Sequence, residues 1–182
     1  MKELELKILN INKRKIKEKL NKLQAKLILK QTLFQEWYFE IPGLTQEERE
    51  FYSLRLRTEG KKSFLTAKNQ SKIQKEDRRY HINKEIEIEI LNVQNLKKLL
   101  NLLRFNIFRQ REKTREIYQL GRVKLAIDQY PKIAPYMEIE GPSKKNIIEI
   151  VKKLGYSPKD TTNKTATILI KEAGINPNSL FF

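Results

Sequence analysis

Ionisable residues recur at two-residue spacing along this sequence, and the residues between them are mostly aliphatic. The sets are Glu3/Glu5/Lys7, Arg55/Arg57, Glu85/Glu87/Glu89, Arg111/Lys113/Arg115 and Glu138/Glu140, and Lys124/Asp128 share one face at a spacing of four. Such alternation is typical of strands, which then present one charged face and one apolar face. Carboxylate oxygens are good ligands for Mg²⁺ or Mn²⁺, and Arg and Lys side chains bind phosphoryl oxygens. If these charged faces line a common interior, the pattern indicates a site for a divalent cation together with a polyphosphate.

The same alternation would also arise in an ordinary half-buried sheet whose charged face lies in water. A closed barrel is favoured because the Glu3-x-Glu5 pair has a counterpart in Glu138-x-Glu140, and the basic pairs lie between them. In such a barrel the apolar faces pack against outer helices and the charges point into a polar lumen. That interior would be costly to desolvate unless acids, bases and a bound ion or ligand compensated one another.

Composition limits the classes of function that this chain can have. It holds 182 residues, 38 of them Lys or Arg and 22 Asp or Glu, for a formal net charge of +16. This balance favours an anionic partner, although a proteome rich in Lys, Ile and Asn would also raise the charge. Cysteine is absent and His81 is the only histidine, which excludes thiolate or multi-histidine metal centres. Without glycine-rich phosphate loops, side chains must bind any phosphate.

Localisation and assembly are less constrained by the sequence. Charged residues interrupt the apolar ones in residues 1–7, and no uncharged apolar run approaches the roughly 20 residues that span a bilayer. We therefore expect a soluble, cytoplasmic protein without a membrane partner, either a monomer or a homodimer. The final residues, Leu180-Phe181-Phe182, could pack on the barrel or contact a second subunit.

The periodicity predicts an α+β domain of about eight mostly antiparallel strands and three or four helices, spanning residues 1–182. Strands are expected over residues 2–9, 28–41, 52–57, 63–68, 78–91, 107–119, 122–130 and 135–141. Apolar residues at three- and four-residue spacing predict helices over 12–26, 92–104 and 143–154, and a short helix near 165–173.

Taken in order, the charged motifs resemble those of the CYTH superfamily, the triphosphate tunnel metalloenzymes. The motifs are Glu3-x-Glu5-x-Lys7, Leu54-Arg55-Leu56-Arg57, Leu65-Thr66-Ala67-Lys68, the strand with Glu85 and Glu87, Lys113-x-Arg115-x-x-Tyr118, Ile127-Asp128 and Tyr136-Met137-Glu138-Ile139-Glu140-Gly141. The resemblance covers roughly residues 1–155 and leaves 156–182 as a C-terminal extension. It implies an eight-stranded antiparallel β-barrel that forms a tunnel, with a charged interior and helices packed outside.

The resemblance also implies roles for individual residues. The expected ligands of the divalent metal, Mg²⁺ or Mn²⁺, are Glu3, Glu5, Asp128, Glu138 and Glu140. The expected triphosphate-binding residues are Lys7, Arg55, Arg57, Lys68, Lys113 and Arg115. Glu85 and Glu87 lie where the family carries acidic residues that help bind a second metal or position the attacking group, so they and Lys7 are the expected catalytic residues.

Two reactions follow from the resemblance, because the superfamily includes thiamine and inorganic triphosphatases as well as class IV adenylate cyclases. We expect hydrolysis of inorganic triphosphate or of a nucleoside or other organic triphosphate. Cyclisation of ATP to cyclic AMP and pyrophosphate ranks second, since Ile133-Ala134-Pro135 replaces the usual Leu-Gly before Glu-x-Glu. The His-Phe pair that some of these cyclases carry before the first motif also has no counterpart. A non-catalytic module that binds RNA or polyphosphate is a further alternative, but carboxylates on the same face would repel phosphates without metal.

Overall fold

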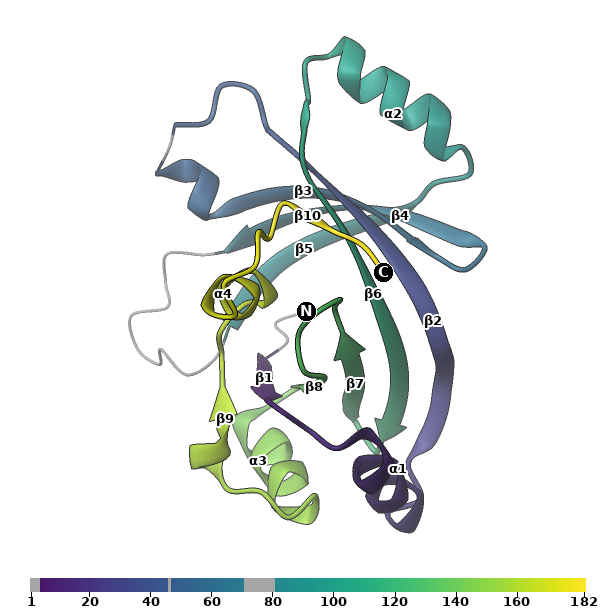
Figure 1. Cartoon of the computed structure of the whole chain (residues 1–182), viewed down its shortest axis with the longest axis vertical. Helices are drawn as coiled ribbons and strands as arrows, with labels where there is room; N and C mark the ends of the chain where they lie inside the picture. The colour runs from purple at the N-terminus through teal and green to yellow at the C-terminus, as the bar shows by residue number, and fades with distance from the viewer. Residues whose placement is uncertain (1–3, 46, 71–80) are drawn as a thin grey trace.

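Eight antiparallel strands follow one another around a barrel in the computed structural model, which describes residues 4–45, 47–70 and 81–182 (Figure 1). They are β1 (Leu4–Ile8), β2 (Lys26–Phe39), β3 (Tyr52–Glu59), β4 (Lys62–Gln70), β5 (His81–Glu89), β6 (Ile107–Leu120), β7 (Val123–Gln129) and β8 (Tyr136–Gly141). Their order is β6-β2-β3-β4-β5-β1-β8-β7, and β7 pairs again with β6. The predicted eight-stranded antiparallel barrel is therefore confirmed.

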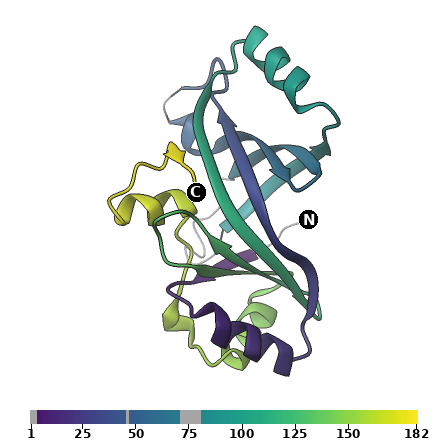
Figure 2. The ribbon, with the colours of Figure 1, turned by 45° about the vertical axis from the view of Figure 1, so that its right-hand side comes forward.

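The two sides of the barrel differ in how continuously they are paired. On one side the long strands β2 and β6 run along most of the length of the molecule (Figure 2). They pair from Lys26 opposite Gln119 at one end to Phe39 opposite Ile107 at the other. On the opposite side, within the described residues, β1 pairs with β5 at Leu4 opposite Ile82 and at Glu5 opposite His81. In the part of the chain that the structure describes, pairing at this junction is limited to these residues, so the barrel is not strictly closed there.

Apolar side chains point outward from the barrel and pack beneath helices. Helices α1 (Lys13–Lys22) and α3 (Lys144–Lys153) cover β1, β7 and β8 at one end, and α2 (Val93–Leu102) covers β2, β3 and β4 at the other (Figure 1). The larger core cluster includes Leu6, Ile8, Ile16, Leu20, Leu125, Met137, Ile139, Ile147 and Leu154, and the smaller one Phe39, Leu56 and Leu100. Because the outward residues are apolar, the alternate charged residues face inward, as predicted.

Local sequence signals begin the three longer helices where the periodicity predicted them. Asn12, Asn92 and Ser143 are the N-cap residues, and each side chain accepts a hydrogen bond from the backbone N–H three residues later. At the end of β8, a Cβ on Gly141 would lie 3.2 Å from side-chain atoms of both Ile147 and Val123. Glycine therefore allows α3 to pack closely on the barrel.

The C-terminal residues add two short strands and a helix to the barrel. Strand β9 (Thr161–Thr162) pairs with β1, and β10 (Ser179–Leu180) pairs in parallel with β6 at Gln110 and Arg111. Between them, α4 (Ala166–Glu172) packs through Ile170 on Tyr130 and Tyr136. Leu180 is buried in the same cluster, whereas Phe181 and Phe182 are largely exposed. Residues 161–180 thus connect the β1 and β6 sides of the barrel.

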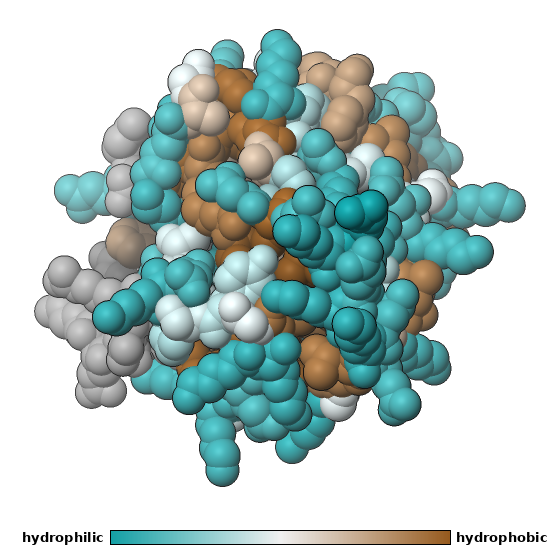
Figure 3. Space-filling view, turned by 60° about the horizontal axis from the view of Figure 1, so that its bottom comes forward, coloured by the Kyte–Doolittle hydropathy of each residue, from teal (hydrophilic) through white to brown (hydrophobic). Residues whose placement is uncertain are grey.

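The outer surface is predominantly polar at the end that carries α1 and α3. Figure 3 shows this end, where hydrophilic side chains surround smaller apolar areas. Much of the positive charge of the chain lies here, since α1 and α3 each carry several Lys or Arg residues and few acids. None of the helices in the described ranges is long and apolar enough to cross a membrane.

Candidate active site

Inside the barrel, Lys7 of β1 lies between two carboxylates, Glu5 of the same strand and Glu138 of the neighbouring strand β8. Its Nζ is 2.6 Å from Glu5 Oε1 and 3.4 Å from Glu138 Oε2. Burial alone would lower the pKa of Lys7, but Glu138 and Glu5 together raise it above its ordinary value. The structure therefore brings together Glu5, Lys7 and Glu138, three residues of the predicted site.

A second group of charges surrounds Asp128 of β7, which is fully buried. Arg115 donates to both of its carboxylate oxygens at 2.5 Å, and Lys113 Nζ lies 3.1 Å from Oδ2. The same Arg115 also donates to Glu138 Oε1 at 3.0 Å, which joins this group to Lys7. Although burial would raise the pKa of Glu138, Arg115 and Lys7 hold it well below its usual range. Glu138 is therefore ionised between Arg115 and Lys7, and Asp128 is paired with Arg115 and Lys113.

A third group centres on Glu36 of β2, a residue that the sequence analysis did not assign to the site. Its carboxylate lies 3.4 Å from Arg55 Nη1 and 3.7 Å from both Lys113 Nζ and Arg111 Nη2. Tyr38 and Tyr130 also donate their hydroxyl hydrogens to it, at 3.2 and 3.1 Å. The available signal was the spacing of Phe34, Glu36 and Tyr38, which the aromatic character of this strand obscured.

The opposite wall, made by β3, β4 and β5, is more open and also carries paired charges. Lys68 Nζ is 2.6 Å from Glu85 Oε2, and Arg57 Nη2 is 3.4 Å from Glu87 Oε1. Thr66 donates a hydrogen bond of 2.7 Å to Glu87 Oε2. Both carboxylates are about one-third exposed, so solvent reaches the predicted catalytic residues of this wall.

Three guanidinium groups inside the barrel keep an unused donor. In the described part of the chain, the buried Nε atoms of Arg55, Arg57 and Arg111 have no hydrogen-bond partner. Arg57 Nε lies 3.4 Å from Glu59 Oε2 but does not form a hydrogen bond with it. A buried donor without a partner costs free energy. These three donors suit an anion with several acceptor oxygens, such as a phosphoryl group.

The remaining predicted metal ligands, Glu140 and Glu3, are not among the contacts described above. Glu140 pairs with Lys124 at 3.1 Å and lies opposite Glu5 on the neighbouring strand, and Glu3 falls outside the described residues. Within the ranges that the structure covers, no three Asp, Glu, His or Cys side chains are grouped to hold a metal. The predicted ligands Glu5, Asp128, Glu138 and Glu140 are instead each paired with a cationic side chain of the protein.

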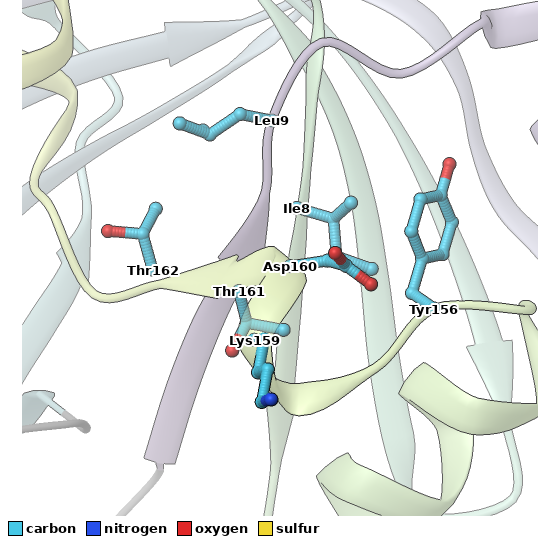
Figure 4. A pocket seen from close by; sticks show the side chains of 7 residues that line it. All are labelled: Ile8, Leu9, Tyr156, Lys159, Asp160, Thr161 and Thr162. Atoms are coloured by element: carbon cyan, nitrogen blue, oxygen red, sulfur yellow. The ribbon is translucent and has the colours of Figure 1, made fainter.

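A separate cavity of about 500 Å³ lies beside β1 and β9, on the outer side of the barrel (Figure 4). It is lined by Ile8, Leu9, Tyr156, Lys159, Asp160, Thr161 and Thr162. Ile8 belongs to the outward apolar face of β1. Asp160 accepts a hydrogen bond from the backbone N–H of Ser157, the N-cap residue of a short 3₁₀ helix (Pro158–Asp160). The charged groups that we assign to the candidate site do not reach this cavity.

The chain is similar to known proteins over most of its length. Residues 1–166 match the CYTH domain family. A protein of Methanocaldococcus jannaschii named "Putative adenylate cyclase MJ0240" is 32% identical over 140 residues, which are 76% of this chain and 75% of that protein.

Two solved structures share the fold at low sequence identity. The "putative adenylate cyclase" of Vibrio parahaemolyticus has a TM-score of 0.79 at 13% identity, over 94% of this chain and 98% of its own. The "Putative adenylyl cyclase HpAC1" from Hippeastrum, described as having a dominant triphosphatase activity, has a TM-score of 0.62 at 16% identity, over 97% of each chain. At these identities the likeness concerns the fold alone.

Proposed function

The chain belongs to the CYTH domain family, and from this membership and the lining of its barrel we propose that it is a divalent-metal-dependent triphosphatase. The observation that carries the proposal is the set of three buried guanidinium donors without partners, on Arg55, Arg57 and Arg111, within the described interior. A triphosphate offers many acceptor oxygens in a row, so one substrate can satisfy all three. Inorganic triphosphate and organic triphosphates share this feature.

In this proposal the basic side chains of the barrel bind the phosphate chain. The residues are Lys7, Arg55, Arg57, Lys68, Lys113 and Arg115, and Arg111 joins them through its donor without a partner in the described residues, so that they extend from four different strands. Arg115 and Lys113 are held by Asp128, and Arg57 by Glu87, so their positions are set before a substrate arrives. Preorganised cations stabilise the negative charge that develops on phosphoryl oxygens during transfer.

We propose that the carboxylates near Lys7 supply oxygen ligands to a divalent cation. Glu5 and Glu138 extend from adjacent strands, both contact the same ammonium nitrogen, and both remain partly exposed. Glu140 lies opposite Glu5 on β8. We propose that these residues, with Asp128 and Glu3, hold Mg²⁺ or Mn²⁺. The bound metal would neutralise charge on the phosphoryl oxygens.

Glu85 and Glu87 face the phosphate-binding residues from the more open wall. They accept from Lys68 and from Thr66, which fixes the direction of each carboxylate. In hydrolysis a water molecule attacks a terminal phosphorus in line with the departing oxygen, and a carboxylate at this position accepts its proton. We propose this role for Glu85 and Glu87, with Lys7 stabilising the charge opposite them.

Cyclisation of ATP is the second candidate, and one observation favours it. The relative from Methanocaldococcus jannaschii, 32% identical to this chain, carries the name of a cyclase. However, the Hippeastrum protein combines a cyclase name with a dominant triphosphatase activity. A cyclase name is therefore compatible with hydrolysis, and we rank hydrolysis first.

A product assay tests the proposal and separates its two forms. Purified protein is given Mg²⁺ or Mn²⁺ with either inorganic triphosphate or ATP, while orthophosphate, pyrophosphate and cyclic AMP are measured. Metal-dependent orthophosphate without cyclic nucleotide supports the triphosphatase, and the faster substrate defines its class. Cyclic AMP together with pyrophosphate supports the cyclase instead. Absence of every product from folded protein contradicts both and leaves a binding role, to be tested with RNA and polyphosphate.

A further inference from the structure

Glu36 is a carboxylate with almost no contact with water. It lies on the inward face of β2 with 1% of its surface exposed, between the outward residues Gln35 and Trp37. A buried charge is costly unless ion pairs and hydrogen bonds compensate it. The charge is kept nonetheless: burial would raise the pKa of Glu36, but Lys113, Arg55 and Arg111 hold it well below its usual range.

The cations around Glu36 come from two different walls of the barrel. Arg55 extends from β3 on one side of β2, and Lys113 and Arg111 extend from β6 on the other. All three lie within 3.7 Å of the Glu36 carboxylate. Two tyrosine hydroxyls, from Tyr38 and Tyr130, fix the carboxylate itself. Glu36 therefore forms ion pairs with basic side chains of two strands, β3 and β6, that are not adjacent to each other.

Glu36 engages its arginines by one edge only. Arg55 and Arg111 approach it through Nη atoms, while their Nε atoms have no partner within residues 4–45, 47–70 and 81–182. Arg111 is also held from its other side, where Nη1 donates to Thr167 Oγ1 of α4 at 3.1 Å and Nη2 to the Tyr38 hydroxyl at 2.7 Å. The Arg111 guanidinium is thus held from two sides, while the Nε atoms of both arginines remain without a partner in the described residues.

We infer that Glu36 is a positioning residue: it holds Arg55, Arg111 and Lys113 in the arrangement that binds the phosphate chain. The inference rests on the proposed function and deepens it, because it names the group that orients the substrate-binding cations. Without the carboxylate, three like charges would lie close together and repel one another. Their side chains would then separate, and the binding geometry for the phosphate chain would be lost.

Glu36→Gln tests the inference, since glutamine keeps the shape and removes the charge. Glu116→Gln is the matched control: Glu116 is also buried on β6, but it faces outward and pairs with Lys17 of α1 at 2.5 Å. We expect Glu36→Gln to raise KM for inorganic triphosphate at least tenfold, to lower kcat much less, and to leave the half-saturating metal concentration unchanged. Glu116→Gln should affect only stability. A KM within twofold of wild type in folded Glu36→Gln protein would overturn the inference.

Tyr130→Phe covers the case in which Glu36→Gln does not fold. It removes one of the two hydroxyl donors to Glu36 and leaves the ring packed in its cluster. We expect KM for inorganic triphosphate to rise several-fold with kcat nearly constant, and an unchanged KM contradicts the inference. Titration calorimetry of wild-type protein with inorganic triphosphate distinguishes failure of the proposed function from failure of the inference about Glu36. If the wild type neither binds nor hydrolyses inorganic triphosphate or ATP, the proposed function fails. If the wild type binds inorganic triphosphate and both variants bind it with unchanged affinity, the inference alone fails.

Discussion

Arg115 and Asp128 are directly opposite one another on β6 and β7, and Arg115 donates from Nε and Nη2 to the two carboxylate oxygens of Asp128, each at 2.5 Å. Paired in this way, the guanidinium plane has a fixed orientation, and its Nη2 also reaches Glu138. Asp128 therefore has a structural part in the site whether or not it also binds a metal.

Asp128→Asn should for this reason lower both stability and turnover. The change leaves Arg115 and Lys113 buried without their shared carboxylate, and breaking a buried pair from one side costs about 3–5 kcal/mol. Urea denaturation and turnover of inorganic triphosphate measure the two effects. Asp160→Asn, at an exposed cap of the 3₁₀ helix, should behave like wild type. An Asp128→Asn free energy of unfolding close to that of wild type would show that the pair is not stabilising.

Glu138→Gln should abolish metal-dependent turnover while the barrel stays folded. Glu138 is shared by Arg115 and Lys7, and its loss removes one of the two carboxylates that contact the Lys7 ammonium. Because the proposed metal would lose one of its carboxylate ligands, we expect a loss of about a hundredfold or more. Glu149→Gln, on the outer surface of α3, serves as the control. Full turnover in Glu138→Gln would remove this residue from the active site.

The charged face of the barrel could be predicted from the sequence because alternation at a spacing of two assigns whole strands to inside or outside. Arg55, Arg57, Lys68, Lys113 and Arg115 all lie on the inward face as expected. Helix starts were also predicted, since Asn92 and Ser143 are local capping signals. Such signals depend only on residues close by in the sequence, so they can be recognised without knowledge of the tertiary structure.

Glu36 could not be assigned in the same way. A lone carboxylate between Gln35 and Trp37 has no acidic partner at a spacing of two, and its neighbours on the inward face are aromatic. What makes it part of the site is the approach of Arg55 and Arg111 from other strands, a relation of register that the sequence does not contain. For the same reason, the contact of Thr167 with Arg111 became visible only in the structure.

Arg57→Ala should weaken binding of triphosphate far more than binding of orthophosphate. A triphosphate spans several cations of the barrel and loses one charged hydrogen bond, worth roughly 1.5–3 kcal/mol, or about a tenfold to hundredfold change in Kd. Orthophosphate can instead occupy other cations. Titration calorimetry with both anions makes the comparison, and Arg14→Ala, an exposed residue of α1, is the control. Equal losses for the two anions would contradict a binding site that extends along the barrel.

Acid should destabilise the protein in part through Glu36. Because its pKa in the folded state is lowered, its ion pairs contribute stability that is fully present above its unfolded pKa of about 4.3 and is lost as pH falls toward the folded value. Glu36→Gln lacks this contribution. The difference in unfolding free energy between wild type and Glu36→Gln should therefore shrink between about pH 5 and pH 3, as measured by denaturant titration. A constant difference over this window would mean that Glu36 does not change its protonation on unfolding.

Leu125→Ala should separate stability from binding, because Leu125 is fully buried on the outward face of β7 beneath the helices. Removing its side chain leaves a cavity in the core and costs about 2–5 kcal/mol. The inward neighbours Lys124 and Ala126 keep their places, so KM for inorganic triphosphate should stay near that of wild type below the melting temperature. Leu91→Ala, which alters a side chain that is 98% exposed, should leave stability unchanged. A tenfold change in KM for Leu125→Ala would mean that the apolar face contributes to the site, contrary to a barrel with its charges inside.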